Sequence, residues 1–312
     1  MATYLITGVA GFIGSALARS LVAQGHHVLG IDNLITGNRS NIPVSCEFIE
    51  GDIADKSVLA LFVGKEINAI LHLAAQSSGE ISFEKPEYDV MTNTLGTLNL
   101  LNFAVDNNIK RFLYASTMSI YGDVDDRAIC EEQSKTPKSY YGITKLAAEH
   151  YVRVFSDRLN TTSFRLFNVY GPGQNMSNLK QGMVSIYLAY FMRNEPVVVK
   201  GSKERYRDLT YIDDVVDAWI ASIDNPSTYG KIYNLATGKK TTVEALLQEL
   251  KSAWGVVEYP IEYQEGTPGD QFGIYADISR LQSDLKWEPK VTLHEGVQRF
   301  VNWVKGDTHA AM

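Results

Sequence analysis

The residues of this chain with the clearest chemistry are Tyr141 and Lys145, which stand four positions apart in a stretch with helical patterning. Side chains at this spacing share one face of a helix, so the Lys145 ammonium is expected to stabilise the ionised form of Tyr141. A free tyrosine titrates at about 10, and a neighbouring cation lowers that pKa. The pair therefore has the chemistry of a general base. The spacing is common by chance, and the alternative is a solvated helix face.

Two motifs upstream make the pair more specific. Ala115-Ser116-Thr117 ends an apolar run, and a glycine turn lies earlier, Thr7-Gly8-Val9-Ala10-Gly11-Phe12-Ile13-Gly14. The turn follows an expected strand, Tyr4–Thr7, and opens an expected helix, Ile13–Gln24. Glycine permits the tight turn and the close approach of backbone to a pyrophosphate, which then lies at the helix N-terminus. The three motifs in this order are far more specific than any one of them.

Asp32 ends the second expected strand, His27–Asp32, at the distance of about 20 residues at which a dinucleotide site places its acidic residue. Its carboxylate accepts hydrogen bonds from a ribose diol and would repel a 2′-phosphate. This position predicts NAD as the cofactor in preference to NADP, and Arg39 is the one nearby residue that argues for NADP. The alternative for Asp32 is a turn residue at a strand end.

Further candidates follow the third and fourth expected strands, Glu47–Glu50 and Ala69–Leu73. Asp52 is placed either to accept a hydrogen bond from an adenine amino group or to cap a helix. Small residues after His72 leave room for the cofactor, and His72 itself is expected to be a packed strand histidine. Asn93 opens a helix, and its amide is expected to hold strand ends or the cofactor ribose.

The composition is that of an ordinary globular protein of 312 residues, enough for one large domain or two interlocked lobes. A net charge of −7 argues against non-specific nucleic-acid binding. Two cysteines, Cys46 and Cys130, provide neither a disulfide framework nor a metal cluster, and no metal is expected. They suit a reducing compartment, so a cytoplasmic location is expected. Neither a signal peptide nor a membrane span is expected.

Strands alternate with helical patterns through the first half of the chain, which predicts an α/β fold with a doubly wound parallel sheet of the Rossmann type. The remaining expected strands there are Arg111–Ala115 and Thr162–Leu166, and the helices include Val58–Val63, Asn93–Asn107 and Tyr141–Leu159. The pattern changes after Tyr170-Gly171-Pro172-Gly173. We therefore expect a first lobe, 1–172 with returning segments at about 210–236, and a smaller mixed α/β lobe, 173–209 and 237–312.

The series of motifs resembles the extended short-chain dehydrogenase/reductase superfamily, in its nucleotide-sugar epimerase/dehydratase branch. The residues that carry the resemblance run in register through nearly the whole chain: Thr7-Gly8-x-x-Gly11-x-x-Gly14, Asp32-Asn33-Leu34, Gly51-Asp52, His72-Leu73-Ala74-Ala75, Ser116-Thr117-x-x-x-Tyr121-Gly122, Tyr141-x-x-x-Lys145, Arg165-x-Phe167-Asn168-x-Tyr170-Gly171-Pro172-Gly173, Arg207-Asp208-x-x-Tyr211-x-Asp213-Asp214, and Gly269-Asp270 followed by Asp277.

The resemblance implies NAD in the first lobe and a nucleoside-diphosphate sugar, a UDP-hexose, in the second. It implies that Thr117, Tyr141 and Lys145 are catalytic, with Thr117 and Tyr141 sharing the substrate 4′-hydroxyl. The cofactor residues it implies are Gly8, Gly11, Phe12, Ile13, Gly14, Asp32, Asn33, Asp52, Ile53, Leu73, Ala74, Ala75, Asn93, Tyr141 and Lys145. The substrate residues are Ser77, Thr117, Tyr141, Asn168, Lys200, Arg207 and Asp270.

The diphosphate site departs from the family pattern at one position. Thr267 stands where the family places an arginine two residues before its Gly-Asp. The sequence therefore leaves open which nucleotide is bound. Lys200 is a candidate to supply the positive charge that the missing arginine would have carried. Arg207 is expected to meet phosphate oxygens, with a structural ion pair to Asp208 or Asp213 as the alternative.

The reaction is indicated by the two residues after Thr117. Sugar 4,6-dehydratases of the family carry Asp-Glu there, and decarboxylases usually keep an acid in the second position. This chain has Met118 and Ser119, neither of which is an acid or base near neutral pH. Glu80 and Glu84 lie in a polar stretch that is expected to be surface. What is left is reversible oxidation at one carbon, so a 4-epimerase is expected, in which the 4-keto sugar turns over before reduction.

Two other functions stay open: a nucleotide-sugar ketoreductase or dehydratase-like enzyme on the same fold, and a non-catalytic NAD-binding scaffold or sensor. Glucose/galactose and N-acetylated sugars are both open, with uronic acids less favoured, and Ile274 is placed near the sugar. A homodimer is expected through Asn93–Asn107 and Tyr141–Leu159, where Leu146, His150, Tyr151, Val154, Phe155 and Asp157 lie near one stripe.

Overall fold

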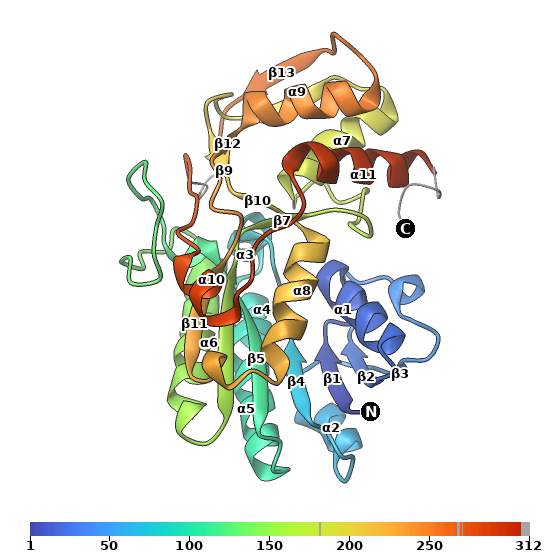
Figure 1. Cartoon of the computed structure of the whole chain (residues 1–312), viewed down its shortest axis with the longest axis vertical. Coiled ribbons are helices and arrows are strands. Elements are labelled where there is room, and N and C mark those ends of the chain that lie inside the picture. Colours follow the sequence, from blue (N-terminus) through green and yellow to red (C-terminus); the bar gives the residue numbers. More distant parts are fainter. Residues whose placement is uncertain (181, 267–268, 270, 307–312) are drawn as a thin grey trace.

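A seven-stranded parallel sheet forms the centre of the computed structural model, which describes residues 1–180, 182–266, 269 and 271–306. Its strands lie in the order β11-β6-β5-β4-β1-β2-β3, and every neighbouring pair is parallel. Figure 1 shows the sheet in the lower half of the molecule. The strands are β1 (Thr3–Thr7), β2 (His27–Asp32), β3 (Glu47–Glu50), β4 (Ala69–His72), β5 (Arg111–Thr117), β6 (Asn160–Leu166) and β11 (Lys231–Leu235).

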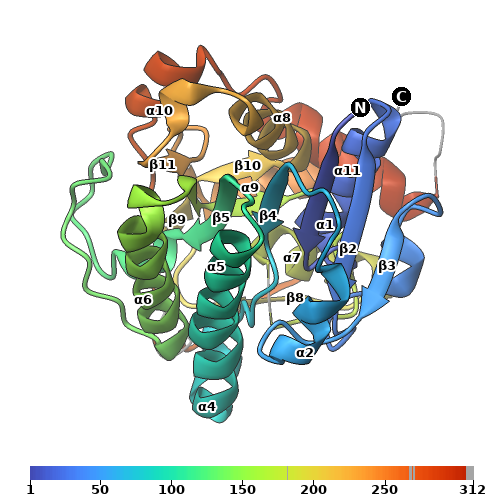
Figure 2. The same cartoon turned by 90° about the horizontal axis from the view of Figure 1, so that it is seen from below.

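Helices cover both faces of the sheet, which confirms the doubly wound α/β fold. Figure 2 shows α1 (Phe12–Ala23) and α8 (Ile212–Ile223) on one side and α5 (Gly96–Asp106) and α6 (Tyr140–Val154) on the other. Successive residues of a strand point to opposite faces, and both faces here are buried. In β1, for example, Tyr4 and Ile6 join one apolar core and Leu5 joins the other. Such two-sided burial is typical of parallel sheets.

A second group of elements lies beyond the carboxyl ends of the strands, in the upper half of Figure 1. Within it β8 pairs in parallel with β13, and α9 packs against α7 and α11. Its elements are α7 (Met183–Arg193), β8 (Val197–Lys200), β9 (Tyr206–Arg207), β12 (Thr241–Thr242), α9 (Val243–Trp254), β13 (Ile261–Gln264) and α11 (Leu293–Lys305). β7 (Asn168–Tyr170) and β10 (Leu209–Tyr211) pair with each other between the two groups. The division into two lobes after residue 172 stays a prediction.

The helices differ from the sequence expectation where the backbone departs from regular α geometry. The expected helix Asn93–Asn107 begins as a wider helical turn, Val90–Leu95, and becomes α5 only at Gly96. α2 (Lys56–Leu59) is followed by a tight turn, so the expected helix Val58–Val63 is shorter and starts earlier. α6 ends at Val154, because a turn and the start of β6 follow at once.

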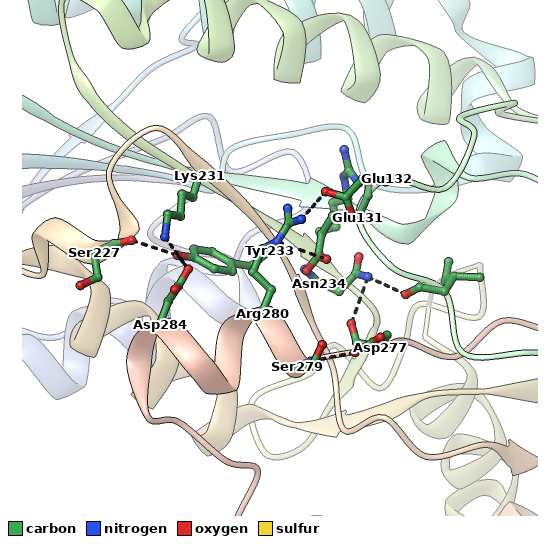
Figure 3. A network of polar contacts seen from close by, with 12 residues as sticks. Glu131, Glu132, Ser227, Lys231, Tyr233, Asn234, Asp277, Ser279, Arg280 and Asp284 are labelled. Carbon is green, nitrogen blue, oxygen red and sulfur yellow. Dashed lines mark hydrogen bonds and ion pairs between the residues drawn. The ribbon is translucent and has the colours of Figure 1, made fainter.

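A polar network fixes the C-terminal segment to the edge strand β11 (Figure 3). The backbone nitrogen of Asn234 donates to the Glu131 carboxylate over 2.8 Å. Arg280 of α10 (Ser279–Leu285) forms ion pairs with Glu131, at 3.8 Å, and with Glu132. Tyr233 donates to Asp284 over 2.8 Å. Gly269 and Gln271, which precede α10 in the chain, line the cavity described below.

Candidate active site

A cavity of about 1070 Å³ lies between the carboxyl ends of the strands and the second group of elements. Single-ligand pockets usually occupy about 300–1,000 Å³, so this one has room for a dinucleotide and a second ligand together. Ligands of open α/β sheets bind at this edge. Each of the three motifs found in the sequence contributes residues to its lining: Gly8, Gly11, Gly14, Ser116, Thr117, Tyr141 and Lys145.

The glycine turn has no space for side chains. Gly8 has φ +73°, and a Cβ on it would lie 2.7 Å from the Ala74 nitrogen. A Cβ on Gly14 would lie 2.1 Å from the Gly8 carbonyl oxygen. α1 starts after Gly11 with no side-chain cap, so its first amides are directed at the cavity. A cradle of this kind fits a pyrophosphate at a helix N-terminus, and Phe12, Ile13, Leu73, Ala74 and Ala75 line it as expected.

Asp32 and Asp52, which the sequence predicted to meet the ribose and the adenine of a cofactor, both line the cavity. The Asp32 carboxylate accepts from the backbone amides of Ala10 at 3.0 Å and Leu34 at 2.9 Å, while burial raises its pKa. It is therefore both a turn residue and a cavity residue. Asn33 donates to Asp52 over 2.9 Å, and both line the cavity with Ile53. The helix-cap alternative for Asp52 is wrong, since α2 is capped by Asp55. Arg39 pairs with Glu50 at 2.6 Å and is not part of the lining.

Asn93 does not line the cavity, which corrects its assignment as a cofactor contact. Its amide oxygen accepts from the Gln76 nitrogen at 2.9 Å, and its nitrogen donates to the Gln76 carbonyl at 3.0 Å. It holds the segment after β4 in place, one of the two roles that the sequence indicated. Because the turn Val90–Leu95 is wider than an α-helix, the neighbouring Thr92 lines the cavity instead. The buried Thr92 hydroxyl has no partner among the described residues, so it is available to a ligand.

Thr117 and Tyr141 are brought together by the start of α6. The Ser139 hydroxyl caps this helix by accepting from the Gly142 amide at 3.1 Å. Gly142 lets the helix approach the turn Met118–Ile120, because a Cβ there would lie 2.7 Å from the Ser119 carbonyl oxygen. Thr117 and Tyr141 then both line the cavity, and the Thr117 hydroxyl lowers the pKa of Tyr141. Lys145, one turn further along α6, is buried, with its ammonium 4.3 Å from the centre of the Tyr114 ring.

The protonation of this pair differs from the sequence expectation. Burial raises the pKa of Tyr141 to about 12, against the lowering effect of the Thr117 hydrogen bond. Burial also lowers the pKa of Lys145 to about 7, although Asp89 and Glu149 act in the opposite direction. Desolvation disfavours both charged forms, so in the protein alone it outweighs the expected stabilisation of the tyrosinate by Lys145.

The substrate end of the cavity contains Ser77, Asn168, Lys200 and Arg207. The buried Arg207 guanidinium donates to the backbone oxygen of Gln271 over 2.8 Å. The alternative ion-pair partners are occupied elsewhere, Asp208 by the amides of Thr237 and Gly238 and Asp213 by Arg299. The buried Asn168 Oδ1 has no partner within the part of the chain that the structure describes. Asp270 and Thr267 lie outside the described residues, as does the rest of the chain after residue 306.

Several lining residues were not found from the sequence. Four further cations line the cavity together with Lys200 and Arg207: Lys85, Lys138, Lys180 and Arg205. Glu80 also lines the cavity, contrary to the expectation of a surface residue, and lies 3.7 Å from Lys180 and 3.6 Å from Lys200. Ile274, expected near the sugar, is buried in the apolar core. An excess of cations in this lining suits a polyanion such as a diphosphate.

Residues 4–236 match the model of the NAD dependent epimerase/dehydratase family. A UDP-glucuronate 4-epimerase of Thermodesulfobacterium geofontis is 33% identical over 321 residues, which cover 98% of this chain and 97% of that protein. A UDP-glucose 4-epimerase of Thermotoga maritima, solved with UDP-glucose, has a TM-score of 0.93 at 34% identity and covers 98% and 99%. A UDP-glucose 4-epimerase of Thermus thermophilus, solved with NAD, has a TM-score of 0.91 at 32% identity and covers 97% and 99%.

Proposed function

Because the chain belongs to the NAD-dependent epimerase/dehydratase family, whose cofactor is NAD, we propose that it is a UDP-hexose 4-epimerase. The observation that carries the proposal is the meeting of Thr117, Tyr141 and Lys145 in one cavity, next to a turn whose first residues are Met118 and Ser119. The set provides a base and its supporting groups, while the positions after Thr117 provide no carboxylate. Oxidation at one carbon followed by its reversal needs nothing more.

Tyr141 is the residue that takes the proton of the sugar 4-hydroxyl and later returns it. Thr117 holds the same hydroxyl by a second hydrogen bond and lowers the pKa of Tyr141. Lys145 supplies positive charge on the same face of α6. Bound NAD⁺ supplies the hydride acceptor at C4 and a further positive charge that favours the tyrosinate. The oxidation at C4 and the reduction that follows together regenerate the cofactor, so no second substrate is consumed.

The diphosphate is held by the cations of the substrate end. Arg207 is the main contact, because its guanidinium is buried and fixed to the backbone of Gln271 and Phe272. The unpartnered amide oxygen of Asn168 is a hydrogen-bond acceptor, so it suits a donor group of the ligand, such as a sugar hydroxyl, and not a phosphate oxygen. Lys200 contributes a longer-range charge from the rim. The sugar itself is a hexose of the glucose/galactose series or its N-acetylated form.

Two alternatives use other features of the cavity. Glu80 is a carboxylate in the lining, so a dehydratase-like elimination has one candidate base, but its contacts with Lys180 and Lys200 place it among the rim charges. A ketoreductase would use the same catalytic residues and consume reduced cofactor. A scaffold or sensor that only binds NAD would have no need of the Thr117–Tyr141 contact.

The proposal is tested by incubating the protein with UDP-glucose, UDP-N-acetylglucosamine and UDP-glucuronate, without added NAD, and following each sugar by NMR. The expected result is a C4 epimer of at least one sugar at catalytic turnover. Oxidation of a sugar to its 4-keto form that proceeds only with stoichiometric added NAD⁺ identifies a ketoreductase running in reverse. No change in any sugar, with NAD bound to the protein, identifies a scaffold.

We further propose that the chain forms a homodimer through the outer faces of α6 and the turn before α5. Exposed apolar side chains gather there, on Ile143, Tyr151 and Val154 of α6 and on Val90 and Met91 of the turn. Phe155, expected in the same stripe, is instead buried. Light scattering is expected to give twice the mass of one chain, and a monomer at micromolar concentration would contradict the proposal.

No helix among the described residues is long and apolar enough to cross a membrane. Cys46 and Cys130 are both free thiols. The expected location in the cytoplasm stays a prediction.

A further inference from the structure

Asp89 is a fully buried carboxylate at the end of α4 (Pro86–Asp89), and the proposed reaction does not yet use it. No lysine or arginine nitrogen of the described residues lies within the ion-pair distance of 4.0 Å. Its oxygens accept instead from Gln76 Nε2 at 2.6 Å, from Asn93 Nδ2 at 3.3 Å and from the Thr144 hydroxyl. Burial raises the pKa of Asp89, while these three donors lower it. A buried carboxylate without a partner cation is costly to ionise, so its place in the structure calls for an explanation.

The three donors come from three segments of the chain, and one of them, Gln76, lines the cavity. Gln76 lines the cavity directly after the cofactor residues Leu73, Ala74 and Ala75. Asn93 comes from the wide turn Val90–Leu95 and holds both backbone polar groups of Gln76. Thr144 lies on α6 immediately before Lys145, and its hydroxyl also contacts the Tyr141 carbonyl oxygen at 3.1 Å. One carboxylate thus joins the cofactor wall to the helix that carries the catalytic pair.

The charge of Asp89 acts on other titratable side chains around the buried Lys145. The titratable groups around the Lys145 ammonium are His72 of β4, Tyr114 of β5, Tyr141 and Glu149 of α6, and Asp89 of α4. Glu149 is paired with the buried Arg165 guanidinium at 2.6 Å, and Ser116 donates to it over 2.6 Å. Asp89 is therefore the carboxylate of this group whose charge is not balanced by a guanidinium. It raises the pKa of both Lys145 and Tyr141.

We propose that Asp89 is a positioning residue of the reaction, which ties α6 to the wall after β4 and places a buried carboxylate beside the helix turn that carries Tyr141 and Lys145. The role in the reaction rests on the proposed function, whereas the effect on Lys145 does not. An anchor made of one carboxylate sets position and charge together, because its oxygens hold Thr144, the residue directly before Lys145 on α6.

The first test is Asp89→Asn, which keeps the shape of the side chain and removes its charge. Without the carboxylate the Lys145 ammonium loses stabilisation, so the pKa of Lys145 falls. The Tyr141 phenolate loses a repulsion, so the pKa of Tyr141 also falls. Both limbs of the pH profile of kcat are expected to move to lower pH by on the order of one unit. Loss of activity with an unmoved profile would reduce Asp89 to a structural residue.

A second readout needs neither activity nor ligand. Protein labelled with ¹³C-lysine is titrated by NMR at Cε, and the Lys145 signal is identified by its absence in Lys145→Met. The pKa of Lys145, about 7 in the parent, is expected to fall by a similar amount in Asp89→Asn. The matched control is Asp214→Asn on α8, a buried carboxylate that accepts from the backbone of Lys290 and Val291 away from the cavity. It is expected to leave the Lys145 titration unmoved.

Thr144→Val separates the two parts of the proposal and serves if Asp89→Asn does not fold. It removes the donor on α6 and keeps the charge of Asp89. The expected result is a roughly tenfold lower kcat, because small misplacement of a catalytic group is costly, with the pKa of Lys145 unchanged. An unchanged kcat would overturn the positioning role, and an unmoved Lys145 titration in Asp89→Asn would overturn the electrostatic role. Either result leaves the proposed epimerase activity standing.

Discussion

The inner end of the cavity and its outer rim hold charge in opposite ways. At the inner end Lys145 is buried, Tyr141 is partly buried, and both have shifted pKa values. At the rim Lys138, Lys180 and Lys200 are exposed and form ion pairs with Asp123 at 2.7 Å, with Glu84 at 2.8 Å and with Glu80 at 3.6 Å. Exposed pairs are screened by salt and contribute little. The chemistry therefore depends on a few buried side chains at the inner end. The exposed lysines of the rim supply a positive potential to which no single lysine is essential.

The largest effect is expected at the inner end, from Tyr141→Phe. The variant keeps the ring and its packing but lacks the group that takes the proton. The turnover number is expected to fall by about 10²–10⁴-fold, the usual contribution of a general base. Steady-state assays on the sugar identified by NMR measure this, with circular dichroism to show that the fold is kept. Near-normal turnover would show that Tyr141 is not the base.

Thr117→Val is expected to have a smaller effect, because it removes one hydrogen bond and leaves the base in place. A net hydrogen bond contributes about 1 kcal/mol, so a loss of about five- to tenfold in kcat is expected. Since the Thr117 contact lowers the pKa of Tyr141, its removal raises that pKa and moves the acid limb of the pH profile to higher pH. An acid limb that stays in place would show that Thr117 acts on position only.

Lys200→Ala probes the rim and is expected to have the smallest effect. An exposed charge at this position is worth about 0.2–1 kcal/mol, so KM for the UDP-sugar is expected to rise about twofold with kcat unchanged. The difference from the parent is expected to vanish at high salt. Measuring KM at two ionic strengths separates a long-range charge effect from a direct contact between Lys200 and the substrate. For a direct contact, KM would rise strongly and stay raised at high salt.

The contrast between the two regions also separates what the sequence could predict from what it could not. The glycine turn, Asp32 and the Tyr141–Lys145 spacing are local patterns, since each depends on residues close together in the chain. Strand bounds followed from the same local signals, and β2 and β3 were predicted to the residue. That these motifs meet in one cavity follows from the parallel sheet, because the carboxyl ends of parallel strands lie at the same edge. The alternation of strands and helices in the sequence already indicates such a sheet.

The sequence-based predictions of site residues failed where the outcome depends on contacts between segments that are far apart in the chain. The wide turn at Val90–Leu95 moved the cavity position from Asn93 to Thr92, and a helical pattern carries no signal of such a turn. Glu80 joined the cavity because Lys180 and Lys200, about a hundred residues later in the chain, come beside it. In the protein alone burial raises the pKa of Tyr141, where the sequence predicted a lowering by Lys145, because desolvation depends on packing that the sequence does not display.

The central claim, reversal of an oxidation at C4, is tested most directly by isotope retention. The UDP-hexose that is turned over is prepared with deuterium at C4 and incubated in ordinary water without added NAD, and the product is analysed by NMR and mass spectrometry. The account predicts a product of unchanged mass, inverted at C4, with the deuterium still on that carbon. Loss of the deuterium to solvent, or a product lighter by one water, would contradict it.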